Sequence, residues 1–419
     1  MNLPQPVPLG LKKSFGFGDR LGLATPGHLT AVRRSDFAPI FAQQSIREMT
    51  RTARMPEEVM TAAQRALAAA RFTGPWGADA DHLKTEQDAQ VTAAAGFCFF
   101  TIDPSAFVVN DADGMSEAQL SEHIAAMERD AMFERGNWQQ VYLAKEFTVS
   151  ESLRLRFERE SLWRAAVKYG RAIAHTAKMA GWIQAACAGR SYEIEISVDE
   201  TDSPTSPVEH LFFGLELKRR GVKAVSLAPR FIGEFEKGID YRGDLKEFER
   251  VLAQHVAIAR FCGPYKLSVH SGSDKFSAYP VIGRLCGDML HVKTAGTSYL
   301  EALRVVARTA PALLAEIAAF CRGRFVEDRK SYHISTTEAE VAALPQYAGA
   351  KDEPAYLDER AGRQLLHVTF GSVLTQGTDA QGRPFKDGIM EQLDRHADLH
   401  LELLDQHFTK HLTLLALGD

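Results

Sequence analysis

Residues 192–221 read YEIEISVDETDSPTSPVEHLFFGLELKRRG, a strand-like stretch followed by a helix-like one. In YEIEISVDE, polar and apolar residues alternate with a period of two, which is typical of a β-strand. In LFFGLELKRRG, apolar residues recur at helical spacing, and the segment between is rich in turn-forming Asp, Ser and Pro. This stretch therefore predicts one complete strand–helix unit.

The same unit recurs along the chain. The candidate strands are LGLAT (21–25), APIFAQQS (38–45), GPWGADADH (74–82), GFCFFTIDP (96–104), YEIEISVDE (192–200), AVSLAPRF (224–231), KLSVHSGS (266–273) and LHVKTAG (290–296). Helical periodicity lies between several of them, and strand–helix alternation favours a parallel sheet. Eight units predict an α/β fold, a closed (β/α)8 TIM-like barrel, with an open doubly wound sheet as the alternative.

Two segments exceed this plan. Residues 105–190 are polar and helical, and we expect a long insertion between the fourth and fifth strands that could fold over the barrel mouth as a lid. Residues 340–419 predict extra C-terminal helices, among them a leucine-patterned helix that we expect to be a core or subunit contact. With no Ser/Gly-rich linker, residues 1–419 are interpreted as one elaborated barrel domain.

Composition excludes several classes of protein. The chain has 419 residues, 45% hydrophobic and 25% charged, the balance of a soluble globular protein. A net charge of −5 gives no basic footprint for nucleic acid, and no apolar run is long enough for a membrane span. The first residues lack a continuous apolar stretch, so we expect no secretory signal and a cytoplasmic location. The five cysteines form no C-x-x-C pair, which favours reduced, buried thiols.

The alternation in YEIEISVDE also predicts where its polar residues lie. Glu193, Glu195, Ser197 and Asp199 share one face, and in a barrel the apolar face packs on the helices, so the carboxylates would face the lumen. Glu195 and Asp199 lie nearer the carboxyl end of the strand, where barrel enzymes perform their chemistry. The alternative is an antiparallel strand with one wet face.

Polar residues share one face on two other predicted strands, and they also end a third. The residues concerned are Asp79, Asp81 and His82 in GPWGADADH, Lys266 and His270 in KLSVHSGS, and His291 and Lys293 in LHVKTAG. A lone histidine on a strand is usually a core or surface residue. Imidazoles and carboxylates gathered at one rim would instead suit a divalent metal cation, either Zn, Mn, Ni or Fe.

Several blocks of the sequence together resemble one known family. SFGFGDRLG, PIFAQQSIREMTRT, GADADHLK, SVDET, LAPRFIGEFEKGIDYRGDL, KLSVHSGSDKFS, HVKTAGTSYLEA and EDRKSYHIS are similar to blocks of the tagaturonate epimerases, also called fructuronate–tagaturonate epimerases. This resemblance spans nearly the whole chain. It implies a metal-dependent isomerase of hexuronate catabolism that interconverts D-fructuronate and D-tagaturonate without a nicotinamide.

The resemblance also implies roles for individual residues. Asp81 matches the proton acceptor, and Glu195 matches its acidic partner. His82 and His270 match metal ligands, and Glu234 matches a third ligand, with Glu236 and Asp240 as competitors. An anionic keto-hexuronate further requires local cations, for which the candidates are Arg230, Lys275 and Lys293.

The two substrates differ at a carbinol centre next to the carbon that is alpha to the ketone. Enolisation exchanges only the alpha hydrogen, so inversion without redox chemistry favours retro-aldol cleavage, rotation of the aldehyde and re-addition. FGFGDRLG carries Leu21 where a dinucleotide motif needs its third glycine, which argues against bound NAD. The alternatives are a metal-dependent ketose isomerase or aldolase on a sugar acid, and a non-catalytic sugar-acid-binding barrel. Assembly as a homo-oligomer is left open.

Overall fold

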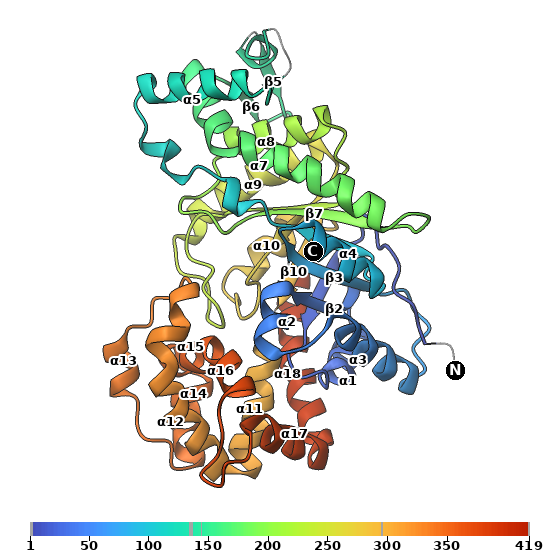
Figure 1. The fold of residues 1–419 in the computed structure, drawn as a ribbon, viewed down its shortest axis with the longest axis vertical. Coiled ribbons are helices and arrows are strands. Elements are labelled where there is room, and N and C mark those ends of the chain that lie inside the picture. Colours follow the sequence, from blue (N-terminus) through green and yellow to red (C-terminus); the bar gives the residue numbers. More distant parts are fainter. Residues whose placement is uncertain (1–2, 134–136, 144, 295, 418–419) are drawn as a thin grey trace.

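The computed structural model describes residues 3–133, 137–143, 145–294 and 296–417. Eight parallel strands close into a barrel in the order β1-β10-β9-β8-β7-β4-β3-β2. The barrel lies in the middle of the molecule (Figure 1). The strands are β1 (Ser14–Gly18), β2 (Ala38–Ser45), β3 (Gly77–Leu83), β4 (Phe99–Ile102), β7 (Glu193–Val198), β8 (Ser226–Pro229), β9 (Lys266–Val269) and β10 (Leu290–Thr294). The predicted (β/α)8 barrel is thus confirmed, and the open-sheet alternative is wrong.

Seven of the eight strands overlap the predicted segments, but the first does not. The strand was predicted at 21–25, whereas β1 is the preceding Ser14–Gly18. The carboxylate of Asp19 accepts hydrogen bonds from the backbone N–H groups of Leu21, Gly22 and Ala24, at 3.1, 2.7 and 2.8 Å. These bonds hold the apolar run in a turn, so it cannot pair with a neighbouring strand.

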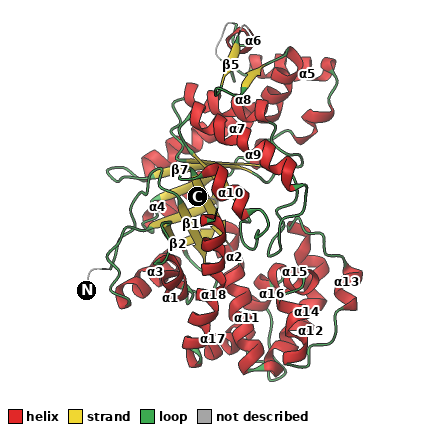
Figure 2. Ribbon diagram, turned by 180° about the vertical axis from the view of Figure 1, so that it is seen from behind, coloured by secondary structure: helices red, strands yellow, loops and turns green. Residues whose placement is uncertain are grey.

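A ring of helices surrounds the barrel (Figure 2). The helices are α1 (Thr25–Val32), α2 (Ile46–Thr52), α3 (Pro56–Ala69), α4 (Glu86–Ala94), α7 (Arg159–Ala186), α8 (Pro207–Arg219), α9 (Leu245–Cys262), α10 (Tyr279–Cys286) and α18 (Ala397–Ala416). The last helix, α18, packs against both α1 and α10 and so closes the ring. The predicted leucine-patterned helix is therefore a core contact, since Leu404, Leu412 and Leu415 are buried there.

The residues predicted as an insertion, 105–190, contain a barrel helix and an added part. Helix α7 is the helix that follows β4, because it packs between α4 and α8. The added part consists of α5 (Glu117–Arg129), α6 (Gln140–Leu143) and the antiparallel pair β5 (Glu146–Thr148) and β6 (Arg154–Arg156). It lies at the top of Figure 1, on the opposite side of the barrel from the C-terminal helices.

The C-terminal helices begin earlier than predicted and build a second hydrophobic core. They are α11 (Thr297–Thr309), α12 (Pro311–Asp328), α13 (Glu338–Ala343), α14 (Glu353–Leu357), α15 (Arg360–Val368), α16 (Phe370–Thr375) and α17 (Phe385–Arg395). Their buried apolar side chains form a cluster separate from the barrel core. The whole group is inserted between β10 and α18 and forms the lower part of Figure 1.

Two further expectations concern the chain as a whole. All five cysteines are buried and none forms a disulfide, as their spacing predicted. In the part of the chain that the structure describes, no helix combines the length and apolar character that crossing a bilayer requires.

Candidate functional site

Four predicted polar residues meet inside the barrel at the carboxyl ends of its strands. Asp81 on β3, Glu195 on β7, His270 directly after β9 and Lys293 on β10 are all buried. The ammonium group of Lys293 lies 2.8 Å from Asp81 Oδ1 and 2.9 Å from Glu195 Oε1. It also lies 2.7 Å from Oδ2 of Asp79. The predicted face of each strand is therefore the face that points into the lumen.

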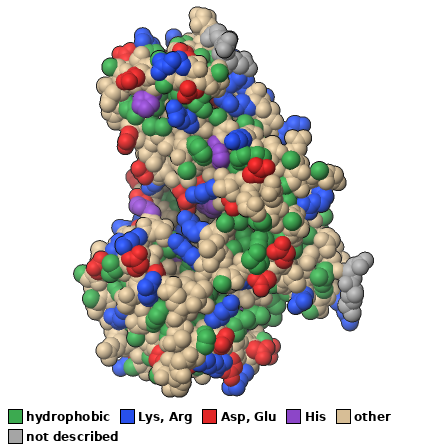
Figure 3. All heavy atoms as spheres, in the orientation of Figure 1, with side chains coloured by type: hydrophobic (Ala, Val, Ile, Leu, Met, Phe, Trp, Pro, Cys, Tyr) green, Lys and Arg blue, Asp and Glu red, His purple; other side chains and the backbone are tan. Residues whose placement is uncertain are grey.

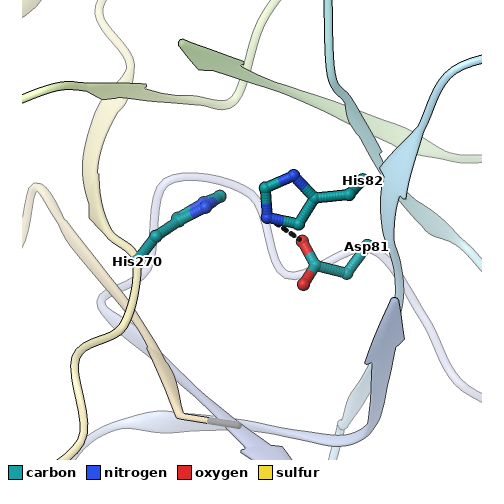
Figure 4. Close-up of side chains that lie close together, drawn as sticks. All are labelled: Asp81, His82 and His270. Atoms are coloured by element: carbon teal, nitrogen blue, oxygen red, sulfur yellow. Dashed lines mark ion pairs between the residues drawn. The ribbon is translucent and has the colours of Figure 1, made fainter. Parts of the chain in front are cut away.

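His82 joins this group through an unusual backbone conformation. Neighbouring residues on a strand point to opposite faces, so Asp81 and His82 should diverge. His82 instead adopts a φ of 55°, and the pairing of β3 with β4 shifts register between Ala80 and Leu83. The His82 and His270 rings therefore lie 5.2 Å apart, from opposite sides of the barrel, with Asp81 beside them (Figure 4).

Both nitrogens of each histidine lie near a carboxylate, but only one nitrogen of each ring forms a hydrogen bond with it. Nδ1 of His82 lies 3.2 Å from Asp103 Oδ2, and Nε2 of His270 lies 2.7 Å from Glu195 Oε1. The other nitrogens have no such hydrogen bond to a described residue: His82 Nε2 lies 3.7 Å from Asp81, and His270 Nδ1 lies 3.2 Å from Asp199 without hydrogen-bond geometry. In metal-binding histidines, the ring nitrogen that does not bind the metal typically donates a hydrogen bond to a carboxylate, which orients the ring.

Buried charges set the protonation of these groups. Burial alone would lower the pKa of both histidines, but Asp199 and Glu195 raise that of His270 to about 10, and Asp81, Glu200 and Asp103 raise that of His82 to about 9. Burial opposes ionisation of Asp81, yet the nearby cations lower its pKa, as they do for Glu195. Carboxylates therefore dominate this site and favour a bound cation.

This donor set fits a divalent metal. Asp81, His82 and His270 each offer one ligand atom, and these atoms lie within 4.8 Å of one another. In a second group, which consists of His82, Asp103 and Glu200, the ligand atoms also lie within 4.8 Å of one another. The two groups share His82. Imidazole and carboxylate donors without thiolates suit Zn, Mn, Ni or Fe, in agreement with the predicted chemistry.

A cavity of about 300 Å³ opens beside His270. Its walls come from helix α2, from the end of β8, from the segments that follow β7, β8 and β9, and from residues 331–333 of the C-terminal helical part. In Figure 3, the molecule is hollowed between the barrel and the C-terminal helices, with Lys, Arg and His side chains along the hollow. The lining residues do not include any described residue of 105–190, so the lid role predicted for that segment remains a prediction.

Glu234 lines this cavity but does not join the histidine cluster. Its Oε2 lies 2.6 Å from His333 Nε2, and its backbone pairs with Arg242. The competitor Glu236 is buried against Arg242, the Ser335 backbone and Gln364, and the competitor Asp240 accepts hydrogen bonds from Ser277. Of the three candidates, Glu234 alone lines the same cavity as His270.

The two remaining predicted cations lie in different settings. Arg230 lines the cavity, bonds to the Thr201 carbonyl and lies 4.0 Å from Glu234. Lys275 is fully buried, and its ammonium donates to the carbonyls of Glu236, Ile239 and Ser273 at 2.8, 2.6 and 2.9 Å. Burial lowers the pKa of Lys275 to about 7. The structure does not bring Lys275 to the cavity, because the backbone around it takes up its donors.

Two carboxylates of the site, Asp79 and Asp103, are given no role by the sequence pattern. Asp79 is part of GADADH, and burial, reinforced by Asp81 and Glu195, raises its pKa to about 7. Asp103 ends the β4 segment and orients His82. The available signal was their position, since both follow or occupy a predicted strand near its carboxyl end.

A family model, a sequence relative and two solved structures all indicate the same protein family. The family model described as tagaturonate epimerase matches residues 1–415. A Thermotoga maritima protein named tagaturonate/fructuronate epimerase is 42% identical over 406 residues, covering 94% of this chain and 82% of the relative. Crystal structures of the fructuronate–tagaturonate epimerase of Cohnella laeviribosi, with one glycerol and in native form, superpose with TM-scores of 0.91 and 0.90 at 39% identity. They match 99% and 98% of this chain and 83% of the solved chain in each case.

Proposed function

The chain belongs to the tagaturonate epimerase family, and on that premise we propose that it interconverts D-fructuronate and D-tagaturonate with a divalent metal. It is an isomerase, as its family is. One observation carries the proposal: Asp81, His82 and His270 converge at the carboxyl ends of β3 and β9. Barrel enzymes place their reacting groups at this end.

The reaction we propose is a retro-aldol cleavage followed by re-addition. A base removes the proton from the hydroxyl group of the carbon to be inverted, and the bond between this carbon and the carbon alpha to the ketone breaks. The bonding electrons move toward the ketone and form an enediolate, while the inverted carbon becomes an aldehyde. After rotation of the aldehyde, the same bond forms on its other face and the oxygen regains its proton.

We assign the proton transfer to Asp81. Neighbouring cations favour its ionised form, which is the form that accepts a proton. Lys293 contacts Asp81 directly and keeps a positive charge beside it. Glu195 was predicted as the complementary acid, but Lys293 and His270 favour its carboxylate form, so we propose that it orients these two residues instead.

We propose that His82 and His270 hold the metal, with Glu234 as the candidate third protein ligand. When bound, a divalent cation polarises the substrate ketone and stabilises negative charge that develops on its oxygen. Asp103 and Glu195 fix the two imidazole rings, so that each keeps one nitrogen free of carboxylate hydrogen bonds from the described residues. Arg230 lines the cavity and is the predicted cation best placed to meet an anionic substrate.

The test is turnover of D-fructuronate by the purified protein, with product identified by NMR. We expect D-tagaturonate as the product, activity that is lost with a chelator, and recovery with one of the four metals. A product with a shifted carbonyl would indicate a ketose isomerase, and released fragments would indicate an aldolase. Binding without turnover under any metal would indicate a sugar-acid-binding barrel.

A further inference from the structure

Among the residues that the structure describes, the cavity contains one cation whose charge no carboxylate neutralises. Arg47 lies 2.9 Å from Glu200, and Arg230 lies 4.0 Å from Glu234. Lys237 also lines the cavity, but its ammonium forms neither an ion pair nor a hydrogen bond with any described residue. An unpaired ammonium has all three of its donors available for a ligand.

Hydrogen bonds from buried side chains hold the backbone on both sides of Lys237. Lys275 binds the carbonyls of Glu236 and Ile239, and Arg363 donates to the carbonyl of Gly238 at 2.7 Å. The Glu236 carboxylate accepts hydrogen bonds from the Ser335 backbone at 2.6 Å and from Gln364 at 2.8 Å. Buried partners thus fix the residues on both sides of Lys237, whereas the Lys237 side chain itself lines the cavity.

We propose that Lys237 binds the carboxylate of the substrate and is a determinant of specificity for keto-hexuronates over neutral ketohexoses. This inference rests on the proposed function. The cavity also contains four acids, Asp199, Glu200, Asp202 and Glu234. The proposed role explains how such a cavity can bind an anion, because these acids do not neutralise the charge of Lys237. In this role Lys275, predicted to bind substrate directly, is a positioning residue for the segment that carries Lys237.

The position of the carboxylate in the substrate gives this contact a second consequence. In D-fructuronate the ketone carbon and the carboxylate carbon lie on opposite sides of the carbon to be inverted, two bonds from it in each direction. Retro-aldol cleavage therefore leaves the carboxylate on the aldehyde fragment. If Lys237 holds this fragment by its carboxylate, the aldehyde group can rotate and present its other face to the enediolate while the fragment stays in the cavity.

The experiment compares Lys237→Met, which keeps most of the side-chain length without the charge, with Lys237→Arg and with Lys246→Met, an exposed lysine at the start of α9. For Lys237→Met we expect the KM for D-fructuronate to rise about 10- to 100-fold, which is the loss of one charge-assisted contact, with a smaller change in kcat. Lys237→Arg should recover part of this loss, and Lys246→Met should behave as wild type.

Calorimetric binding of D-galactonate and galactitol, a six-carbon acid and its neutral counterpart, separates charge recognition from structural damage. Lys237→Met should weaken D-galactonate binding by a similar factor and leave galactitol binding unchanged. An unchanged KM in an active protein, or equal losses for both ligands, overturns the assignment of Lys237 and leaves the proposed function intact. A wild-type protein that does not turn over D-fructuronate overturns both.

Discussion

The ammonium nitrogen of Lys293 lies 2.8 Å from Oδ1 of Asp81, although β10 and β3 are far apart in the sequence. The same nitrogen contacts Asp79 and Glu195. One buried cation therefore links three buried carboxylates at the end of the barrel. Removing one partner of such a group is more costly than the net strength of the group suggests, because the remaining charges stay buried and unpaired.

Lys293→Met should destabilise the metal-free protein by about 3–5 kcal/mol at neutral pH. The loss should grow with pH. Without Lys293, the folded protein holds protons on buried carboxyls whose pKa lies above the unfolded value, as that of Asp79 does already at about 7. The folded state then binds more protons than the unfolded state, so stability falls as pH rises from about 4 through 7.

Urea unfolding at pH 5 and pH 8 measures this dependence. Adding Asp79→Asn to Lys293→Met should recover part of the loss at pH 8, because it removes one of the unpaired charges. An identical loss at both pH values, with no recovery in the double variant, would mean that Lys293 acts through packing alone.

His82→Ala and His270→Ala should each reduce both metal content and activity. Each substitution removes one of the two imidazole donors in the Asp81–His82–His270 cluster. Metal analysis of the purified variants, with circular dichroism to verify the fold, measures the effect. His175→Ala is a matched control, because that histidine contacts the Lys84 carbonyl outside the cluster. Full metal occupancy in both cluster variants would exclude these ligands.

Asp81→Asn should retain the fold and most of the metal while turnover falls about 10²- to 10⁴-fold. The amide is nearly isosteric with the carboxylate but cannot accept the hydroxyl proton. Steady-state kinetics with D-fructuronate, beside metal analysis of the same sample, separate the two effects. A rate close to wild type would assign the base to another residue.

Epimerisation in deuterated water should leave the inverted carbon without deuterium. In retro-aldol chemistry this carbon keeps its own hydrogen, because only bonds to oxygen and to the neighbouring carbon change. NMR of the product reads the label directly. Deuterium at the inverted carbon would indicate direct deprotonation, and a requirement for added nicotinamide would indicate transient oxidation.

The sequence alone determined the strand–helix alternation and most of the inner face of the strands, whereas the structure decided that the sheet closes into a barrel. Period-two alternation depends only on the geometry of an extended chain, so it is sufficient to assign Glu195 and Lys293 to the lumen. Strand–helix alternation likewise determined the parallel sheet, because parallel neighbours require a crossover. The first strand was misplaced because the side chain of Asp19 decides the conformation of the residues that follow it.

Other features were decided only by the tertiary structure, since they depend on contacts between distant segments or on single backbone angles. The positive φ of His82 turns it to the same side as Asp81, against strand alternation. Lys275 and Lys237 are equally cationic in the sequence, but backbone carbonyls consume the donors of Lys275, whereas Lys237 pairs with none of the described residues around the cavity. Residue types show which charged groups a chain has. Only the packing of the folded chain determines which of these groups have partners within the protein.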